Sequence, residues 1–561
     1  MTMTKDTSNR RTTTLRKSAL AAISTGAIIA SGAVAVAQID DNPSPPLTLK
    51  TNYLGYAASV SPRVGYSDNI NLAPNGLEED EIIGSVFFSG NAVVSTKAFT
   101  GLISGDLDFS YLTDQEDFNV NQRISGAGTA TISENLAYFD VSGSTSRQLI
   151  GDNARFSQNL NAARNEQVGV HSFSLSPFLN RQFENGSAAE LRYRFTQVFV
   201  DNGGPNPIAA ALPDSRSQQI AAKYDTGDRF DRVKLGLTAI GTRVEEYDAA
   251  LIPDLEYDHG YLVADLQVEL TDNIALAGSV GVDEFDSDAS EFFFPAERLS
   301  EMNWTAGVIL SPSRRTSLEV RYGERFGESY FSGNLQYKLS DRVRFSANAG
   351  RDFRTRAQAL STRFRISQLS VLELADQLRE GYEIEPEGVI QSFLDNRNGG
   401  QAQVLGVSIS DFASANLTGV FDRTRLSLGA SYSHDDFNFR TNEGFDVVGS
   451  VEREFSRRLR GYANAFYRYA DTDVDIDTCA LNPAAFGLST LEALLDPVGA
   501  CTAFAGVNGK TNTVGGRVGA SYQIYRNLAV FGEYAHTTRF SENELLEFDE
   551  NVVQAGLTLD F

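Results

Sequence analysis

The chain has 561 residues and a formal net charge of −25, with 73 acidic against 48 basic side chains. A charge this negative argues against binding nucleic acid through its phosphates. Beyond residue 37 no apolar run approaches the roughly 20 residues that a membrane-spanning helix needs, yet Gly, Phe and Tyr are abundant and Pro is scarce. That mixture suits a porin-like wall in which only alternate residues contact lipid.

The first 37 residues predict a secretory signal. Its positive start is formed by Arg10, Arg11, Arg16 and Lys17. A weakly apolar stretch over residues 19–36 follows, and Ala35-Val36-Ala37 supplies the small residues of a cleavage site. An uncleaved membrane anchor is the alternative. We assign residues 1–37 to the signal, 38–55 to a short periplasmic segment and 56–561 to the folded protein.

Short turns are the clearest pattern in the rest of the chain. Each has an apolar residue, then polar turn formers, then an apolar residue that opens a new alternating run, as in a tight hairpin. In chain order they cover residues 132–136, 226–233, 270–274, 310–318, 339–343, 421–424, 455–459 and 524–528.

Longer, polar and mostly acidic connections separate these turns. We place them at residues 67–81, 113–120, 150–166, 201–215, 244–258, 286–299, 355–407, 435–443, 471–510 and 541–549, with one short connection near Gly327. Short turns that alternate with long connections are typical of an even-stranded outer-membrane barrel. We therefore predict an all-β, transmembrane, antiparallel up-and-down β-barrel of about 22 strands, in a range of roughly 18–24. A soluble β-sandwich competes, but repeated sandwich domains need linkers that this chain lacks.

Ten arginines fall on the polar side of the alternating strands and are predicted to face the lumen. They are Arg192, Arg194, Arg321, Arg325, Arg342, Arg344, Arg354, Arg425, Arg460 and Arg468. A guanidinium that faced lipid near the bilayer centre would cost about 2–4 kcal/mol, which favours this orientation. Two interpretations stay open. The arginines attract anionic solutes or acidic sugar chains, or they pair with the lumen acids Asp265, Glu269, Glu319 and Glu533 and brace the wall.

The connection over residues 355–407 departs from the strand pattern. Apolar residues between Val371 and Phe393 recur at roughly helical spacing among many acids, which predicts one or two short amphipathic helices. One hypothesis is that this insertion folds into the lumen and narrows it through Glu373, Asp376 and Glu380. The alternative, which we prefer, is an outer cap that lies over the rim.

The long outer connection over residues 471–510 holds both cysteines, Cys479 and Cys501. An exported, oxidising setting favours a disulfide between them, with two unpaired thiols as the alternative. An acidic run opens this connection: Asp471, Asp473, Asp475 and Asp477. Ile476 stands where an EF-hand needs Gly, and Asn482 stands where it needs Glu, so we interpret the run as a solvated rim and predict no metal site.

The chain ends on an alternating strand. Val553, Ala555, Leu557, Leu559 and Phe561 share one face, and polar or small residues lie between them. A terminal Phe preceded by apolar residues at every second position is similar to the signal that the barrel-assembly machinery reads. Phe561 is therefore our candidate assembly signal, and that machinery is a predicted partner.

The sequence gives little support for catalysis. Its four histidines are scattered, and neither a Gly-x-Ser-x-Gly elbow nor a cluster with metal-ligand spacing occurs. We predict that the protein is not an enzyme and needs no cofactor.

Residues 64–74, Val-Gly-Tyr-Ser-Asp-Asn-Ile-Asn-Leu-Ala-Pro, are followed by Glu78, Glu79 and Asp80. This opening resembles the outer-membrane β-barrel porin family found beside exopolysaccharide and exosortase gene clusters. The Arg-rich stretch from Arg351 to Arg365, followed by residues 372–378, also looks like members of that family. The resemblance implies a barrel linked to polysaccharide export, and it implies no catalytic residues.

Taken together, these patterns predict a bacterial outer-membrane channel for passive passage or export of a hydrophilic solute, with an anionic solute or a polysaccharide as candidates. Expected partners are outer-membrane lipid, lipopolysaccharide and polysaccharide-export proteins. The alternative is a plugged barrel that only docks parts of a secretion assembly. A third possibility, an active receptor, conflicts with the short stretch between Gln38 and the first strand, because such receptors carry a large plug domain there.

Overall fold

The computed structural model describes residues 53–149, 155–157, 159, 161–162, 167–201, 212–248, 254–287, 299–355, 407–437, 440–481, 495–507 and 509–561. The predicted signal, the insertion that follows residue 355 and its candidates Glu373, Asp376 and Glu380 therefore lie outside the described residues. The first strand begins at Tyr53.

The described residues form 22 strands and very little helix. The first eleven strands are β1 (Tyr53–Ser67), β2 (Glu81–Ser95), β3 (Phe99–Leu112), β4 (Asp117–Ser133), β5 (Ala137–Leu149), β6 (Gln167–Gln182), β7 (Ala188–Val200), β8 (Asp214–Asp225), β9 (Val233–Tyr247), β10 (Leu255–Thr271) and β11 (Ile274–Ser287). The other eleven are β12 (Met302–Ser313), β13 (Thr316–Arg325), β14 (Glu328–Ser340), β15 (Val343–Thr355), β16 (Val407–Phe421), β17 (Thr424–Phe437), β18 (Arg440–Glu454), β19 (Leu459–Val474), β20 (Thr511–Tyr525), β21 (Leu528–Ser541) and β22 (Phe548–Asp560).

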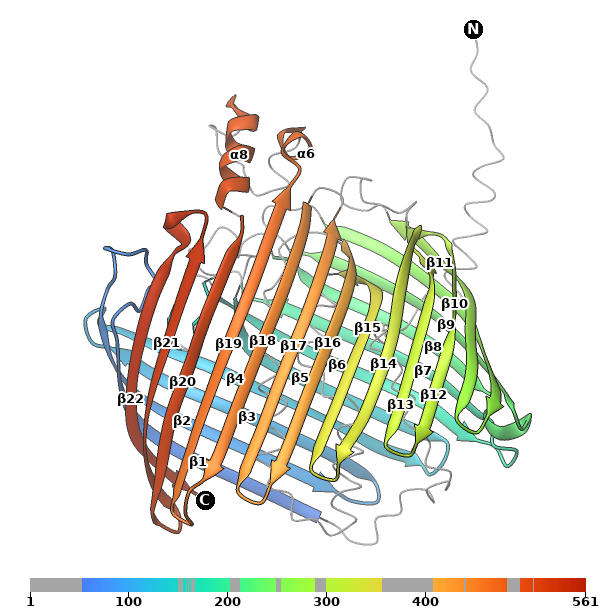
Figure 1. Cartoon of the computed structure of the whole chain (residues 1–561), viewed down its shortest axis with the longest axis horizontal. Helices are drawn as coiled ribbons and strands as arrows, with labels where there is room; N and C mark the ends of the chain where they lie inside the picture. The colour runs from blue at the N-terminus through green and yellow to red at the C-terminus, as the bar shows by residue number, and fades with distance from the viewer. Residues whose placement is uncertain are drawn as a thin grey trace.

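The strands close into one barrel (Figure 1). Each pairs antiparallel with its neighbours along the chain, and β1 pairs with β22, with Ser67 opposite Val552 and Ser59 opposite Asp560. The predicted all-β barrel and its strand number are confirmed. Closure leaves no sheet edge, so the backbone amides of the wall find partners without help from water.

The barrel has a turn end and a loop end, named after the connections that lie there. All the predicted short turns lie at the turn end, together with two that the sequence pattern does not mark, at residues 96–98 and 183–187. The longer connections lie at the loop end. Three connections there are short. Residues 113–116 join β3 to β4, Phe326 and Gly327 both have positive φ, as a two-residue hairpin requires, and Phe437 pairs directly with Arg440. The connections predicted at 113–120 and 435–443 are therefore shorter than expected.

The connection after β19 contains two helices, α6 (Ile476–Leu481) and α8 (Pro497–Val507), which stand above the loop end in Figure 1. A disulfide joins Cys479 of α6 to Cys501 of α8. Short 3-10 turns, η3 (Gly227–Arg229) and η5 (Glu544–Leu546), complete the described elements. None of the helices in the described ranges is long and apolar enough to cross a membrane.

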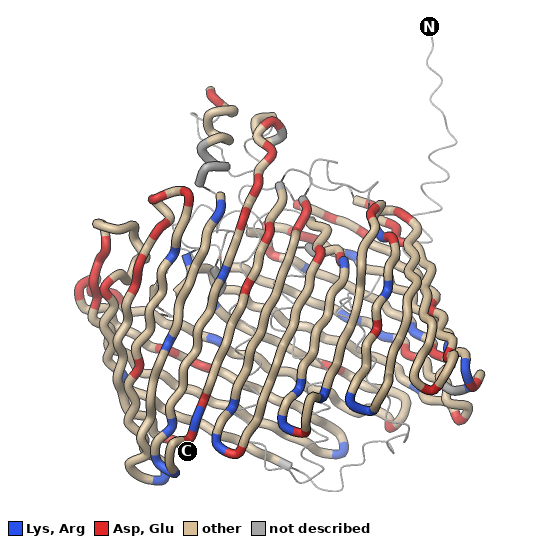
Figure 2. Tube along the Cα trace, viewed as in Figure 1, with Lys and Arg blue, Asp and Glu red and all other residues tan. Residues whose placement is uncertain are grey.

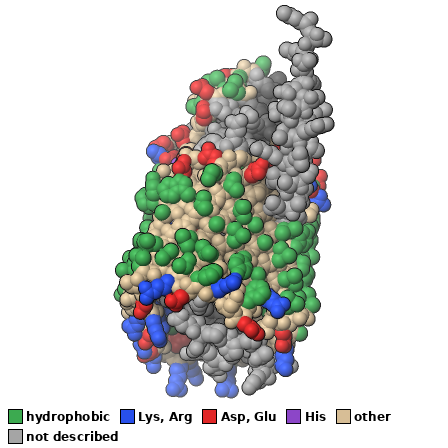
Figure 3. Space-filling view, turned by 90° about the vertical axis from the view of Figure 1, so that its right-hand side faces the viewer, with side chains coloured by type: hydrophobic (Ala, Val, Ile, Leu, Met, Phe, Trp, Pro, Cys, Tyr) green, Lys and Arg blue, Asp and Glu red, His purple; other side chains and the backbone are tan. Residues whose placement is uncertain are grey.

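The outer face of the barrel is apolar in its middle and charged at its ends. On the face seen in Figure 3, hydrophobic side chains form a belt across the middle of the wall, and Figure 2 shows acidic residues gathering at the loop end and basic residues at the turn end. Exposed aromatic residues border the belt on both sides, Trp304, Tyr322 and Phe331 toward the loop end and Phe455 and Tyr525 toward the turn end. Aromatic girdles round an apolar band are typical of transmembrane barrels.

Small apolar clusters lie inside the loop end. The largest comprises Val244, Tyr257, Phe285, Leu299, Phe326, Phe353 and Ile409. Pairing of β15 with β14 stops at Ala349, whereas its pairing with β16 continues to Thr355. The ends of β15 and β16 thus separate from β14, and Phe353 and Ile409 pack against residues of β10 and β11.

Candidate functional site: the inner wall of the barrel

The strand register fixes which side chains face the lumen. On β7, Glu190, Arg192 and Arg194 share one face, and the intervening Leu191 is half exposed on the other. Successive side chains of a strand point to opposite faces, so an apolar outer face leaves the charged residues inside. The same alternation brings charges from neighbouring strands together across the inner wall.

Arg192 has the least exposed side chain among those predicted lumen arginines whose side chains are described. Its guanidinium contacts Asp140 of β5 at 2.6 Å and Glu190 at 2.8 Å, and it lies 3.8 Å from the ring centroid of Phe178. Arg194 donates to the side-chain oxygen of Gln219 at 3.3 Å. Arg192 therefore carries an acidic partner, as the bracing interpretation expects.

Arg321 also lies between two of the acids that were predicted to pair with lumen arginines. It pairs with Glu319 on its own strand and with Asp265 of β10, at 2.9 Å. Glu269, another of those acids, contacts Lys234 at 3.1 Å. Glu533 accepts a hydrogen bond from the Tyr462 hydroxyl at 2.7 Å. Glu319 thus contacts a residue of its own strand, whereas Asp265, Glu269 and Glu533 contact residues of other strands.

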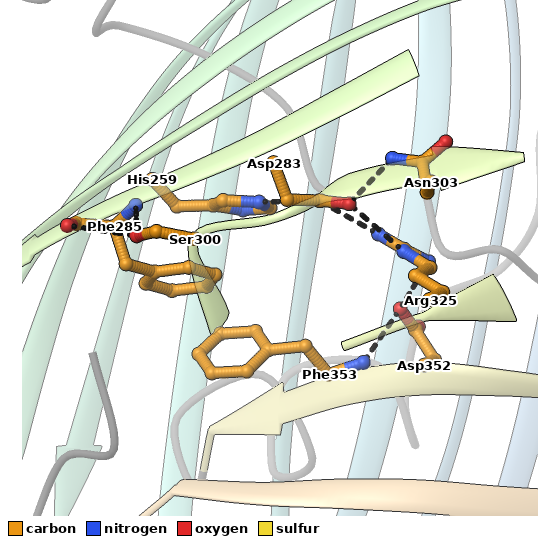
Figure 4. A network of polar contacts seen from close by, with 8 residues as sticks. All are labelled: His259, Asp283, Phe285, Ser300, Asn303, Arg325, Asp352 and Phe353. Carbon is orange, nitrogen blue, oxygen red and sulfur yellow. Dashed lines mark hydrogen bonds and ion pairs between the residues drawn. The ribbon is translucent and has the colours of Figure 1, made fainter. Parts of the chain in front are cut away.

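Arg325 anchors a buried network that joins five strands (Figure 4). Its Nε and Nη2 donate to the two oxygens of Asp283 at 3.2 and 3.1 Å, a bidentate geometry that strengthens the pair. Asn303 donates to the same carboxylate at 2.7 Å, and His259 Nε2 lies 3.1 Å from it. Asp352 lies 3.7 Å from the far side of the guanidinium.

Aromatic packing encloses this network on one side. The His259 ring stacks on Phe285 with centroids 4.2 Å apart, and Phe285 contacts Phe353 at 4.5 Å. Ser300 accepts from the backbone N–H of Phe285 at 2.8 Å. The network thus ties the inward-leaning end of β15 to the wall formed by β10–β13, and its buried, paired charges suit a structural role.

Most of the remaining predicted arginines also face the lumen, and several of them pair with acids. Arg425 and Arg460 share Glu452 at 3.8 and 3.2 Å, and Arg468 contacts Asp446 at 2.7 Å. Arg344 faces inward opposite Lys338. For Arg354 the backbone is described within β15 and the side chain is not.

Arg342 does not lie on the wall. It occupies the turn between β14 and β15, where it is exposed and contacts Asp422 of a neighbouring turn at 2.9 Å. The lumen-facing prediction for Arg342 is wrong, because this position lies within the turn predicted at residues 339–343, where strand parity does not apply.

Some inner-wall charges are missing from the predicted set. Arg63 of β1 lies 3.8 Å from the ring centroid of Phe87, and Arg351 of β15 pairs with both Asp411 and Glu328. The alternation of Ser59, Ser61 and Arg63 would have revealed the first. The second has the parity of the lipid-facing side and becomes buried only because β15 leaves β14.

Part of the β5–β6 connection lies inside the loop end. Its described residues, 155–157, 159, 161 and 162, are called the inner segment here. Asn161 and Ala162 are buried, and Ala162 packs with Leu72 and Phe548. No sequence signal marks this segment, because short polar stretches look alike whether they project outward or fold inward.

The loop end is acidic and holds no evident metal centre. The backbone N–H of Gly76 donates to Glu78 at 2.7 Å and lowers the pKa of this exposed carboxyl group below its usual value. Across the described ranges, three or more His, Cys, Asp or Glu side chains nowhere converge as a metal ion would need.

Comparison with known proteins finds similarity of structure only. Neither protein-family models nor curated proteins match the chain. Among solved structures, the FrpB iron transporter of Neisseria meningitidis is 10% identical with a TM-score of 0.46, over 90% of this chain and 81% of that one. The ferric-catecholate import receptor Fiu of E. coli K12 is 9% identical, with a TM-score of 0.45 over 90% and 82%.

The siderophore receptor PirA of Pseudomonas aeruginosa is 10% identical, with a TM-score of 0.42 over 90% of this chain and 80% of that one. At these identities and TM-scores, the similarity to these solved structures carries no argument about the function of this chain.

Proposed function

We propose that this protein is a bacterial outer-membrane channel through which a hydrophilic solute passes without direct energy input. The observation that carries the proposal is a closed 22-stranded barrel with an apolar belt on its outer face and charged side chains on its inner wall. A lipid-facing apolar band round a wet interior is the arrangement of transmembrane barrels in that membrane. The turn end then faces the periplasm and the acidic loop end faces the cell exterior, where lipopolysaccharide is the expected neighbour.

The ion pairs of the inner wall argue against a channel that prefers anionic solutes. Arg192, Arg321 and Arg468 each contact carboxylates within 2.9 Å, so their positive fields are largely compensated. We therefore propose a solute chosen by size and hydrophilicity. The resemblance of residues 64–80 to barrels associated with exopolysaccharide favours a polysaccharide chain, delivered by export proteins of the periplasm.

Conductance in planar bilayers tests the proposal. The purified full-length protein should insert and give stepwise current, and liposomes that contain it should swell in solutions of small sugars. Similar permeability to potassium and chloride would support the compensated wall. A strong preference for chloride would contradict it and restore the anion-attracting interpretation.

A second candidate is a barrel whose lumen is closed and whose surfaces hold assembly partners. The inward position of the inner segment favours it, because this segment occupies space inside the mouth. Protein that inserts and resists heat denaturation, yet neither conducts nor admits sugars, would identify this second candidate and reject the channel.

A further inference from the structure

The inner segment is fastened to the barrel wall at one end by Asn161. The side-chain oxygen of Asn161 accepts from Ser110 of β3 at 2.6 Å and from Asn119 and Asn121 of β4 at 3.0 and 3.1 Å. Asn161 is buried. Three donors from two strands hold this position more firmly than one exposed contact could, because water competes poorly for buried groups.

A buried carboxylate on the opposite side of the β1–β22 seam holds the middle of the segment. Glu550 of β22 is 1% exposed. It accepts from Asn159 Nδ2 at 3.0 Å and from the hydroxyl of Ser157. Ser67 of β1 donates to it as well, at 2.9 Å. Three side chains donate to this one buried carboxyl group, which makes Glu550 a strong attachment point.

The other end of the segment contacts β19. The ring of Phe156 lies edge-on to Phe466 with centroids 5.1 Å apart, and the Arg468 guanidinium lies 4.7 Å from the centroid of Phe156. Arg155 donates to the backbone oxygen of Leu72 at 2.8 Å. Phe156 and Asn161 are therefore attached to well-separated parts of the wall.

The spacing of those attachments places the main chain of the segment inside the mouth, away from the backbone of the wall. From β3 to β19 the wall passes through β2, β1, β22, β21 and β20. At about 4.8 Å between strands, tilted by roughly 40°, that path measures about 38 Å. The main chain from residue 156 to residue 161 can extend over at most roughly 17 Å. The main chain is therefore much shorter than the stretch of wall between its attachments, and side chains at its two ends and in its middle connect it to the wall.

The same carboxylate belongs to a set of contacts that closes the barrel at its loop end. Both oxygens of Asp68 accept from Asn551, at 2.7 Å from its backbone and 2.8 Å from its side chain. Asn69 is fully buried and donates to the backbone oxygen of Asp549 at 2.9 Å. We call Ser67, Asp68, Asn69, Glu550 and Asn551 the clasp. Its first three residues lie in the sequence motif of residues 64–74, which begins within β1 and extends beyond its end.

We propose that the clasp holds the inner segment as a fixed narrowing of the channel mouth, so that this segment sets the size limit for the solute. Glu550 serves both tasks: it joins β22 to β1, and it holds Ser157 and Asn159 inside the lumen. The size limit rests on the proposed channel function, whereas the attachment of the inner segment to the wall does not depend on that function. The solute most affected is a bulky hydrophilic one, such as a sugar chain.

The variants Glu550→Ala and Asn161→Ala test this proposal in the full-length protein. Each removes one attachment, and Asn161→Ala leaves the clasp intact if Glu550→Ala fails to assemble. Both variants should show higher single-channel conductance in planar bilayers and should admit larger polyethylene glycols than the wild type. The matched control is Glu319→Ala, which removes a lumen carboxylate from β13, a strand that the inner segment does not contact through any described residue; it should leave the polymer size limit unchanged.

Hydrogen exchange of the peptide that contains residues 155–162 separates the two levels of the proposal. Its amides should be protected in the wild type and lose protection in both attachment variants, whether or not the protein conducts. Unchanged protection would show that Glu550 and Asn161 do not hold the segment. Lost protection with an unchanged polymer limit would show that the segment is held but does not narrow the channel. If the wild-type protein never conducts, the channel and its size limit are both rejected. The hydrogen-exchange data then still show whether Glu550 and Asn161 hold the segment.

Discussion

At the scale of single residues, burial decides how much the loss of one partner of an ion pair costs in stability. Arg325 and Asp283 are buried and bidentate, whereas Arg342 and Asp422 are exposed at the turn end. A buried pair that loses one partner leaves an unpaired charge in a region of low polarity. An exposed pair exchanges its partner for water at little cost.

Asp283→Ala should therefore destabilise the barrel strongly. Removal of the carboxylate leaves Arg325 buried without its main partner, at a cost of roughly 3–5 kcal/mol in the free energy of unfolding. Urea unfolding from lipid vesicles measures this difference. Arg342→Gln is the control, for which we expect a change of less than about 1 kcal/mol.

The double variant Asp283→Leu with Arg325→Met sharpens the test. If the loss arises from the orphaned charge, the double variant should be more stable than the sum of the two single changes implies. Additive losses would mean that the two side chains contribute through separate contacts.

Arg321→Gln should shift the ion selectivity of the channel toward cations. The change leaves Asp265 and Glu319 without the guanidinium that lies between them, so the local field becomes negative. Reversal potentials in a salt gradient measure the shift, best at low salt because screening acts over about 8 Å at physiological ionic strength. Arg342→Gln removes the same charge from a turn, and an equal shift in that variant would refute a local effect at the wall.

At the scale of elements, the helices α6 and α8 depend on their cross-link more than on their own length. Both are shorter than the 12–15 residues below which isolated helices are marginal in water. The disulfide joins positions 22 residues apart in the chain and keeps the two helices adjacent. It acts on the connection and not on the closed wall.

Cys501→Ser should consequently loosen this connection and spare the barrel. Limited proteolysis should cut within residues 475–510 faster than in the wild type, while the unfolding midpoint of the barrel stays the same. Wild-type protein under reducing conditions should give the same pattern. Equal cleavage rates in all three samples would show that the helices are held by other contacts.

A substitution at the end of the last strand distinguishes an effect on the stability of the barrel from an effect on its assembly in cells. The backbone N–H of Phe561 donates to Ala58 at 2.9 Å, and its side chain is largely exposed on the outer face. Phe561→Ala keeps the backbone hydrogen bond and removes little packing. We therefore expect normal refolding of the purified variant in detergent.

In cells, the same variant should give less heat-modifiable, membrane-inserted protein, because the terminal aromatic is our candidate signal for the assembly machinery. Tyr525→Ala is the matched control, since Tyr525 is equally exposed near the turn end. Loss of assembly in both variants would point to lipid contacts and not to recognition of the terminus.

At the scale of the whole molecule, closure is the property on which the other features depend. A barrel without an edge can place polar groups inside and apolar groups outside at every strand, since each backbone amide is already satisfied. The clasp adds side-chain contacts where the first and last strands meet. Far-ultraviolet circular dichroism in detergent should accordingly be dominated by β-structure, and a mainly helical spectrum would contradict the fold.

The sequence by itself determined the periodic features. Alternation within strands and the spacing of short turns predicted the all-β barrel and its 22 strands, because a side-chain period of two and a turn between strands are local properties. The same period predicted the inward parity of Arg192, Arg321 and Arg325. The position of both cysteines in one long connection, together with an oxidising setting, predicted the Cys479–Cys501 bond.

Only the tertiary structure decided which distant side chains meet. Parity cannot show that Arg351 becomes buried or that Asp283 collects donors from three other strands, because these depend on where β15 leaves β14 and on the register between strands. The position of the inner segment is equally hidden from the sequence. Glu550 is hundreds of residues from the segment along the chain and Asn119 is tens of residues from it, so local sequence patterns do not report these contacts.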